Sequence, residues 1–284
     1  MTFSIVARDP ATGQLGVAVA TCTLAVGRAA PWARAGVGAV ATQASSQRGY
    51  GPRLLARLAA GADAGTALAE LLAADAGADQ RQVGVVGPAG PPAAWTGVGC
   101  LSACGHRTGA DYTAQGNMLS SRSVVPSVAE GYAGIGAEGH AEATTDFAAR
   151  LVAALRAGDA AGGDLRGRQS AALLVVSGTR DEEAPWEGVL VDLRVDDAAD
   201  PVAELARLLR LQRAYETGDW QLLAEEAPEG VRELHVALAA AARGDRDGAR
   251  DALRALRVRP GWEGWLRRLR LNGRLPATDE LLRY

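Results

Sequence analysis

Lysine is the clearest absence from this chain of 284 residues. All 30 basic side chains are arginine, and the chain has only three cysteines, two phenylalanines and 5% aromatic residues. A protein without lysine cannot form a Schiff base through a lysine amine or use lysine as a general base. It also cannot build the usual phosphate-binding P-loop. Composition therefore excludes these three kinds of chemistry.

Long apolar segments are also missing. No run of 18 apolar residues occurs, and no charged and apolar leader precedes Thr2, so we expect no membrane span and a cytoplasmic protein. The few cysteines fit a reducing compartment better than a disulfide framework. The net charge of −3 gives no basic surface for nucleic acid. We expect a small-molecule amide or peptide as substrate, no nucleic-acid or membrane partner, and a homo-oligomer.

The most informative residue is Thr2, which follows Met1 and begins a strand-like run. Removal of Met1 would leave a threonine that carries both a hydroxyl and a free α-amine. An α-amine has an ordinary pKa of about 7.7–8.0, so it can take the hydroxyl proton near neutral pH. Many proteins begin this way without any chemical role, and a nucleophile also needs a site around it.

Alternation of apolar and polar residues predicts a hairpin at the start of the chain, with strands over residues 3–8 and 15–21. Counting back from the turn sets Thr2 roughly opposite Ala20 and brings Thr21 and Cys22 near the N-terminus. Pro31 and Trp32 are expected in a loop. Further strands are predicted over residues 36–43, 82–86, 93–96, 112–119, 170–177 and 188–195, and helices over residues 51–60, 64–74, 126–132 and 142–157.

This order of strand pairs and helix pairs predicts antiparallel sheets with helices on their outer faces, an α+β fold. A four-layer αββα sandwich satisfies the order, and two-layer α+β folds also would. From about residue 200 the pattern is purely helical, with helices expected over residues 201–216, 235–243, 247–257 and 264–271. We therefore predict a sandwich domain at residues 1–210 and a small all-helical domain at residues 211–284.

Several long strings match one family. They include Thr2-Phe-Ser-Ile-Val-Ala-Arg-Asp-Pro10, Gln115-Gly-Asn-Met-Leu119 and Gly162-Gly-Asp-Leu-Arg-Gly-Arg-Gln-Ser-Ala171, with further matches at residues 16–20, 31–43, 50–53, 105–106 and 192–201. Together they resemble a bacterial family catalogued as domain of unknown function 1028, which is grouped with the N-terminal-nucleophile (Ntn) hydrolases. The tail, through residues 259–262, resembles a helical domain named for peptidoglycan binding.

The resemblance implies the αββα sandwich and hydrolase ancestry, without a known substrate. It also implies that the strand before the first helix ends beside the nucleophile, which puts Gln43 and the backbone amides of residues 44–46 where an oxyanion hole is needed. The alternative for Gln43 is a buried amide that satisfies loop carbonyls. Any positive charge beside the nucleophile would come from Arg8, Arg28 or Arg34. Ala103-Cys104 departs from the Trp-Ala pair expected before residues 105–106, so the pocket can differ from that of relatives.

Two amide side chains flank Gly116 within a predicted strand. Gln115 and Asn117 share one face because strand side chains repeat every two residues. They are therefore candidates to act together on a substrate or on the Thr2 ammonium. The alternative is a polar network that ties two sheets together.

A glycine-rich, charged segment leads into the strongly apolar strand over residues 170–177. Asp164 or Ser170 is a candidate to orient the Thr2 amine, and Arg166 is a candidate to bind a substrate carboxylate. The alternative is an Asp–Arg pair that braces a loop. The segment is not a phosphate cradle, because the lysine and the strand-then-helix context are both missing.

Cysteine and histidine cluster at Cys100, Cys104 and His106, with Cys22 as a conceivable fourth zinc ligand. The spacing is not that of a standard zinc knuckle, so we expect packed thiols, no metal and no cofactor. His106 is interpreted as a histidine that braces a loop, with a role as general base as the alternative. Cys22 and His106 are kept as candidate substrate contacts.

The leading hypothesis is an Ntn-type amidohydrolase that cleaves a C–N bond of a small amide, peptide or cyclic acyl compound through Thr2. The competing hypothesis is a non-catalytic protein of the same architecture that binds a small ligand or cell-wall fragment. A purely structural oligomer is the third. Trp220, Trp262 and Trp265 in the tail are expected to anchor helix packing, with sugar stacking as the alternative.

Overall fold

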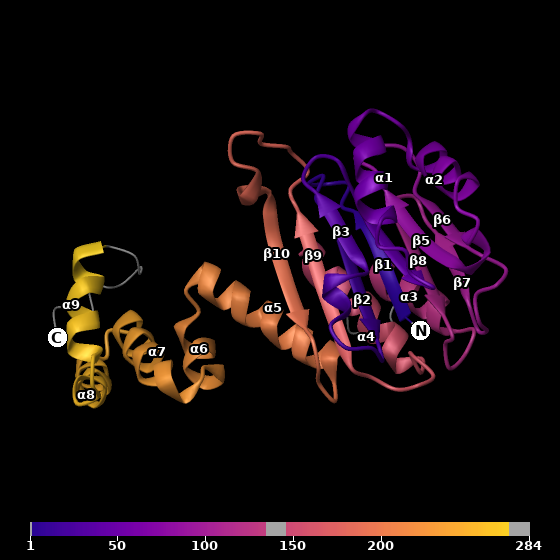
Figure 1. Cartoon of the computed structure of the whole chain (residues 1–284). Coiled ribbons are helices and arrows are strands. Elements are labelled where there is room, and N and C mark those ends of the chain that lie inside the picture. The colour runs from indigo at the N-terminus through magenta and orange to yellow at the C-terminus, as the bar shows by residue number, and fades with distance from the viewer. Residues whose placement is uncertain (1, 135–145, 273–284) are drawn as a thin grey trace. The chain divides into compact units, whose positions relative to one another are not determined.

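The computed structural model describes residues 2–134 and 146–272 of the chain. Its contacts divide the protein into two compact units, residues 1–206 and 207–284. The first, called here the N-terminal domain, contains all the strands of the described residues, and the second, the helical domain, has an apolar core of its own. Figure 1 shows the elements of both units.

Two antiparallel sheets form the N-terminal domain. The larger has the order β10-β9-β2-β1-β8-β7 and the smaller the order β3-β4-β5-β6. The strands of the larger sheet are β1 (Thr2–Arg8), β2 (Leu15–Thr21), β7 (Gly105–Thr108), β8 (Tyr112–Asn117), β9 (Ser170–Val176) and β10 (Val189–Val195). Those of the smaller sheet are β3 (Pro31–Arg34), β4 (Gly38–Ala44), β5 (Arg81–Val86) and β6 (Ala93–Thr96).

The two sheets face each other, and helices cover their outer faces (Figure 1). Helices α1 (Tyr50–Ala59) and α2 (Ala64–Ala73) pack on the smaller sheet, and α3 (Val124–Ala133) and α4 (Phe147–Ala160) pack on the larger one. This confirms the mixed α+β class and the antiparallel sheets with helices outside. Because β1 lies between β2 and β8, its first residue is enclosed by neighbouring strands on both sides.

The alternation of side chains along β1 decides where Thr2 points. Val6 packs between the sheets, against Ala39 and Ala41 of β4, whereas Phe3 contacts Gly158 of α4 on the other face. Side chains at positions two apart share a face. Thr2 therefore points into the space between the two sheets, the same side as Val6.

The structure corrects several sequence predictions. The segment at Pro31 and Trp32 is a short strand rather than a loop, β7 was not predicted, and β8 ends at Asn117 rather than at Leu119. In the first hairpin Phe3, not Thr2, pairs with Ala20. This slip of one residue places Thr21 beside Thr2. Of the helix predicted over residues 142–157, residues 142–145 lie outside the described part, and α4 runs to Ala160.

The helical domain consists of short helices packed in sequence. They are α6 (Trp220–Glu226), α7 (Glu229–Ala242), α8 (Arg246–Arg257) and α9 (Trp262–Asn272), preceded by α5 (Pro201–Thr217), which runs across the division between the units. The predicted hairpin is formed by α7 and α8, which pack through small residues. Helix α6 was not predicted. Trp220 is buried as expected, whereas Trp265 is 42% exposed. Within the described residues, no helix has the length and apolar character that a membrane span requires.

Candidate functional site

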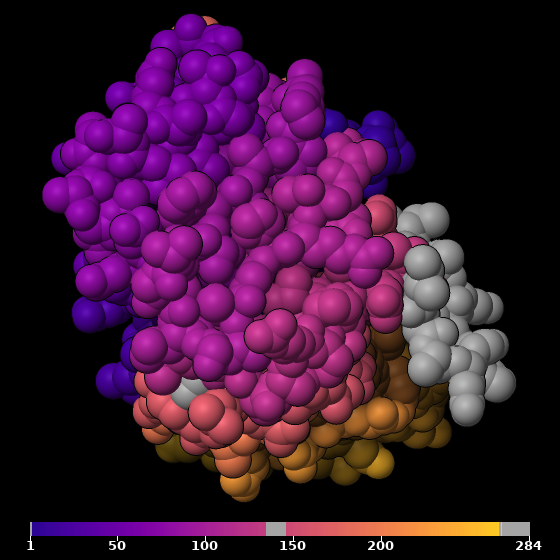
Figure 2. All heavy atoms as spheres, turned by 90° about the vertical axis from the view of Figure 1, so that its right-hand side faces the viewer, coloured from indigo at the N-terminus to yellow at the C-terminus, as the bar shows by residue number. Residues whose placement is uncertain are grey.

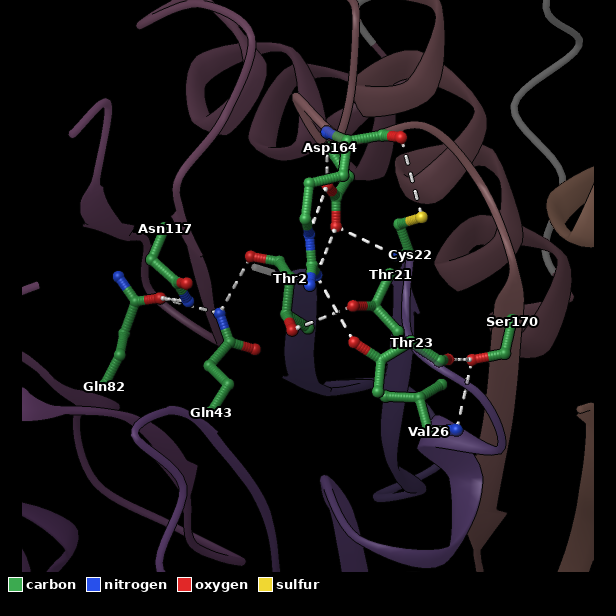
Figure 3. A network of polar contacts seen from close by, with 11 residues as sticks. Thr2, Thr21, Cys22, Thr23, Val26, Gln43, Gln82, Asn117, Asp164 and Ser170 are labelled. Atoms are coloured by element: carbon green, nitrogen blue, oxygen red, sulfur yellow. Dashed lines mark hydrogen bonds and ion pairs between the residues drawn. The ribbon is translucent and has the colours of Figure 1, made fainter. Parts of the chain in front are cut away.

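Thr2 lies at the buried end of the central strand. Its side-chain oxygen Oγ1 is 3.3 Å from Oγ1 of Thr21 on β2, and its backbone pairs with that of Asn117 on β8. Its carbonyl oxygen accepts a hydrogen bond of 3.3 Å from Nε2 of Gln43 on β4. Figure 3 shows Thr2 with Gln43 and Asn117 on one side and Thr21 on the other. Residues from both sheets thus hold Thr2 in place.

Gln43 is held by hydrogen bonds on both ends of its amide. Its oxygen accepts a hydrogen bond of 2.7 Å from Ser4 Oγ, and Nε2 donates to Gln82 Oε1 at 2.7 Å as well as to the Thr2 carbonyl. Both amide hydrogens are therefore engaged within the protein. The structure places Gln43 beside Thr2 as predicted, and its contacts make it a residue that positions the Thr2 backbone rather than a donor to an oxyanion.

Gln82 is the centre of the buried network, and the sequence analysis missed it. Its Oε1 accepts hydrogen bonds from Gln43 and from Asn117 Nδ2, the latter at 2.8 Å. Its Nε2 donates to the Gly116 carbonyl at 2.8 Å and to Thr96 Oγ1 at 2.9 Å. The available sequence signal was a glutamine in an otherwise apolar predicted strand. The structure buries this side chain completely, and buried amides need hydrogen-bond partners.

Gln115 lies deeper in the same network. Its Nε2 donates a hydrogen bond of 2.6 Å to Ser4 Oγ, and its Oε1 accepts one of 2.9 Å from Thr113 Oγ1. The side chain is completely buried. It reaches toward Gly84 of the opposite sheet, where an added Cβ would lie 2.3 Å from Oε1. Gln115 and Asn117 do share one face, and the network they belong to ties the two sheets together.

A cavity of about 340 Å³ opens beside this network, lined by Ala44, Ser45, Gln80, Gly99, Cys100, Leu101, Asn117 and Met118. It lies at the ends of β4 and β8, the strands that contact Thr2 from either sheet. Two lining residues other than glycine have left-handed backbone, Ala44 with φ of 67° and Met118 with φ of 51°. Strained backbone of this kind is costly and gathers at functional sites. Figure 2 views the molecule from the right-hand side of Figure 1, where magenta atoms from the middle of the chain occupy the centre of the face.

The backbone amides expected to form an oxyanion hole are partly engaged elsewhere. The Ser45 amide donates to the Gln80 carbonyl at 3.1 Å. The Ser45 carbonyl accepts a hydrogen bond of 2.6 Å from Arg81, which is paired with Asp75. Arg81 holds the pKa of Asp75 at about 2, well below the ordinary value. This ion pair fixes the segment that lines the cavity after β4.

Asp164 and Arg166 form a second cluster near Thr2. Asp164 Oδ2 accepts a hydrogen bond of 2.8 Å from the Cys22 amide, and the Arg166 guanidinium pairs with the same oxygen at 3.2 Å. The Arg166 amide donates to Oδ1 at 2.9 Å. Cys22 Sγ lies 3.6 Å from the Arg166 carbonyl oxygen. The structure therefore brings Cys22, Asp164 and Arg166 together, next to Thr21.

Ser170 lies farther along the same edge of the sheet. Its hydroxyl donates to the Thr23 carbonyl and accepts a hydrogen bond of 3.1 Å from the Val26 amide. The side chain is completely buried and pairs across the sheet with Thr21. These contacts show Ser170 bracing the turn after β2, and no hydrogen bond between Ser170 and Thr2 is found in the described residues.

His106 is connected to the network from its outer side. Its Nδ1 is 2.9 Å from Thr96 Oγ1, which already accepts a hydrogen bond from Gln82. The Thr96 hydroxyl donates to Nδ1 when the ring carries its proton on Nε2, and accepts from Nδ1 in the other tautomer. Burial lowers the pKa of His106, in keeping with a neutral ring. His106 lies in strand β7 rather than in the loop that the sequence analysis expected, and its contact with Thr96 links β7 to β6.

The cysteines near His106 remain thiols. Cys100 Sγ donates to the Arg81 carbonyl at 3.4 Å, and Cys104 Sγ to the Cys100 carbonyl at 3.4 Å. Burial, helped by Cys104, raises the pKa of Cys100. Within residues 2–134 and 146–272, no group of three or more His, Cys, Asp or Glu side chains is arranged to hold a metal ion.

Two of the arginines suggested as a charge beside Thr2 lie elsewhere. Arg8 is at the opposite end of β1, paired with Asp111, and Arg34 pairs with Gly38 at the far end of β4 from Gln43. Arg166 is bound to residues at the Thr2 end of the sheet. It contacts Thr23 Oγ1 at 3.3 Å, two residues after Thr21.

Comparison with known proteins identifies relatives but no activity. Residues 2–205 match the model of a family of unknown function, DUF1028. The crystal structure of protein SPO2555 from Silicibacter pomeroyi, which carries the same family model, is 32% identical with a TM-score of 0.65, over 77% of this chain and 92% of that one. No curated protein matches the chain in sequence. The resemblance inferred from the sequence strings is thus confirmed at the level of the family: the chain belongs to the DUF1028 family.

Proposed function

We propose that the N-terminal domain is an Ntn-type amidohydrolase whose nucleophile is the hydroxyl of Thr2, exposed as an N-terminal residue by cleavage of the bond between Met1 and Thr2. The observation that carries the proposal is the position of Thr2. It ends the central strand, points between the two sheets, and lies against residues from β2, β4 and β8. The helix-sheet-sheet-helix order of the domain accords with the Ntn architecture.

The reaction would begin with transfer of the Thr2 hydroxyl proton to the Thr2 α-amine as Oγ1 attacks the amide carbonyl carbon. The ammonium then gives this proton to the leaving nitrogen as the C–N bond breaks, leaving an ester on Thr2. Water attacks the ester, and its proton passes through the α-amine to the departing threonine oxygen. One amide and one water thus yield one acid and one amine, with no cofactor.

Asn117 is the proposed donor to the oxyanion. Its Nδ2 donates one hydrogen bond, to Gln82, and this contact fixes the direction of the amide. The same residue lines the cavity and pairs with Thr2 in the sheet. A second hydrogen on Nδ2 is assigned to the carbonyl oxygen that becomes negative during attack. Gln43 then positions the nucleophile through the Thr2 carbonyl.

A panel of small amides, N-acyl amino acids and cyclic imides tests the proposal. The wild type should hydrolyse at least one member, Thr2→Ala should be inactive, and Thr2→Ser should keep part of the activity because it retains the hydroxyl and the amine. Asp79→Ala, an exposed side chain that does not line the cavity, is the control for general effects of substitution. Full turnover by Thr2→Ala on an identified substrate contradicts the proposal.

A second candidate is a non-catalytic binding protein. It is favoured by the closure of the amide network, since the hydrogens on Nε2 of Gln43 and Gln82 all go to protein acceptors. Such a network can hold two sheets together without taking part in chemistry. A binding protein should tolerate a retained Met1 or an N-terminal extension, whereas the amidohydrolase should lose its activity with either.

The helical domain is proposed to bind a cell-wall fragment, as its resemblance to a peptidoglycan-binding domain suggests. Trp262 and Trp265 are 5.0 Å apart between ring centres and line a cavity of about 390 Å³ with Val231, Pro260 and Gly261. Exposed indole rings can stack on sugars. Loss of binding to muramyl glycans in Trp265→Ala would support this, and unchanged or absent binding would contradict it.

A further inference from the structure

The loop that carries Arg166 crosses the end of β1 at which Thr2 lies. On the β2 side, the Cys22 amide donates to Asp164 and the Gln169 amide donates to the Thr21 carbonyl at 3.0 Å. On the β8 side, the Ser120 amide donates to the Gly163 carbonyl at 3.0 Å, and Leu119 bridges to Asp164. Because β1 lies between β2 and β8, a loop bonded to both must pass over the end of β1.

The glycines of this loop make the crossing possible. Gly162, Gly163 and Gly167 have φ of 110°, 55° and 111°, values in the left-handed region that residues with a Cβ rarely adopt. At Gly162 an added Cβ would also lie 2.2 Å from Ser120 Oγ. The sequence thus specifies one path for the loop, directly over the strand that ends at Thr2.

Asp164 fixes the guanidinium of Arg166 within this loop. The carboxylate is 2% exposed and binds Arg166 through Nε at 3.4 Å and through Nη2 at 3.2 Å. It also accepts the backbone amides of Cys22 and Arg166. The Asp164–Arg166 pair is neutral overall, and together with these two amides it holds the guanidinium in one orientation. The Arg166 side chain is 41% exposed, so a ligand can reach it.

The hydrogen bonds described above around Thr2 come from uncharged side chains. The side chains that contact Thr2 or its partners are hydroxyls and amides, those of Thr21, Gln43, Gln82 and Asn117. These groups can hold the polar parts of an amide but offer no full charge to a ligand. Asp164 engages Nε and Nη2 of Arg166, and Nη2 also contacts Thr23, so a substrate carboxylate would approach the Nη1 end of the guanidinium.

We infer that Arg166 binds the carboxylate of the substrate, so that the natural substrate class is an amide bearing a carboxylate, such as an N-acyl amino acid. This inference rests on the proposed function, because it specifies the substrate of the site at Thr2. Asp164 is then a positioning residue that acts through Arg166, and the loop of residues 162–168 sets the distance between the carboxylate and the scissile carbonyl.

Arg168 provides a matched control in the same loop. It pairs with Asp159 of α4 at 2.8 Å and is 48% exposed, so it resembles Arg166 in charge, pairing and exposure. It has no contact with Asp164, Cys22 or Thr23 among the described interactions. If Arg166→Gln weakens carboxylate binding and Arg168→Gln does not, the effect is therefore due to the position of Arg166 rather than to the net charge of the loop.

The test measures binding without requiring hydrolysis. The full-length Thr2→Ala protein, with and without Arg166→Gln or Arg168→Gln, is titrated by NMR with N-acetylglycine, N-acetyl-L-aspartate and N-acetyl-L-glutamate. Each is compared with the derivative in which carboxamide replaces carboxylate. At least one carboxylate should bind tenfold or more tightly than its carboxamide, Arg166→Gln should remove that difference, and Arg168→Gln should keep it.

Equal binding of every carboxylate and its carboxamide overturns the inference, as does an unchanged preference in Arg166→Gln. If Arg166→Gln does not fold, Arg166→Lys replaces it, and intermediate binding is expected because lysine keeps the charge without the guanidinium that Asp164 orients. The two proposals fail separately. If the protein retains Met1 yet prefers carboxylates, the carboxylate site stands and the hydrolase proposal fails. If it hydrolyses amides without preferring carboxylates, the hydrolase proposal stands and the carboxylate site fails.

Discussion

The side-chain amide of Asn117 donates a hydrogen bond of 2.8 Å to the side-chain oxygen of Gln82, across the space between the two sheets. Gln82 in turn accepts from Gln43, which holds the Thr2 carbonyl. A single glutamine thus connects the proposed nucleophile and the proposed oxyanion donor. The predictions below follow from this connection and from the residues that support it.

Gln82→Leu should lower the free energy of unfolding by at least about 2 kcal/mol, because it leaves the buried amides of Gln43 and Asn117 without their shared acceptor. Denaturant titration of the variant checks this. Gln80→Leu is the control, since the same substitution two residues earlier falls on an exposed side chain and should change stability by less than about 0.5 kcal/mol. Equal effects of the two substitutions would contradict the central place of Gln82.

Gly84→Ala should destabilise the domain by about 1–3 kcal/mol, because the added methyl group would lie 2.3 Å from Gln115 Oε1 and push that amide off Ser4. Gly105→Ala is the matched control. It is also a glycine in a strand of this domain, and an added Cβ would meet no atom within 4 Å. Thermal unfolding of both variants measures the difference, and a stable Gly84→Ala variant would refute the tight packing of Gln115.

Thr21→Val should lower kcat about fivefold on any substrate found for the wild type while leaving KM nearly unchanged. The substitution keeps the shape of the side chain and removes the hydroxyl that lies 3.3 Å from Thr2 Oγ1, a contact worth about 1 kcal/mol.

Thr113→Val is the control for Thr21→Val, because it removes another buried hydroxyl of the same sheet, one bonded to Gln115 rather than to Thr2. Steady-state kinetics should show normal kcat for this variant. Equal losses of kcat in both variants would mean that the Thr21 effect is structural.

Asp75→Asn should reduce stability most near neutral pH. The folded-state pKa of Asp75 is about 2, because of Arg81, against an ordinary value of about 3.9. The unfolded state binds more protons between these values, so the contribution is present above pH 4 and is lost as the pH falls toward 2. In urea titrations from pH 7 to pH 2, the free energies of unfolding of the wild type and of Asp75→Asn should converge. A difference that does not change with pH would contradict the role of the ion pair. Asp79→Asn, an exposed carboxyl nearby, is the control.

The alternation of apolar residues predicted most of the strands and the antiparallel sheets, because buried strands such as β1 and β2 have a strong pattern. β3 and β7 were missed because each has only four residues, and in β7 the side chains are also largely exposed, so neither shows a clear apolar pattern. The hairpin register was wrong by one residue, since it depends on how the loop at residues 9–14 closes, with the Asp9 amide bonded to the Gln14 carbonyl.

Sequence motifs identified several of the candidate residues. Their contacts could not be predicted, because they form only where the two sheets face each other. Gln43 and Asn117 were identified and do lie beside Thr2. Gln82 was not, because its importance arises only where β5 faces β8 and a local pattern carries no information on that pairing. The position of Arg166 likewise depends on a loop that bonds to two strands distant in sequence.

The intact mass of the untagged protein, expressed without any N-terminal addition, tests the central claim most directly, because the proposed chemistry requires a free α-amine on Thr2. The account predicts a mass that lacks one methionine, with Thr2 as the first residue in N-terminal sequencing. A mass that retains Met1 would contradict it, since the amine would be held in a peptide bond and could not serve as the base.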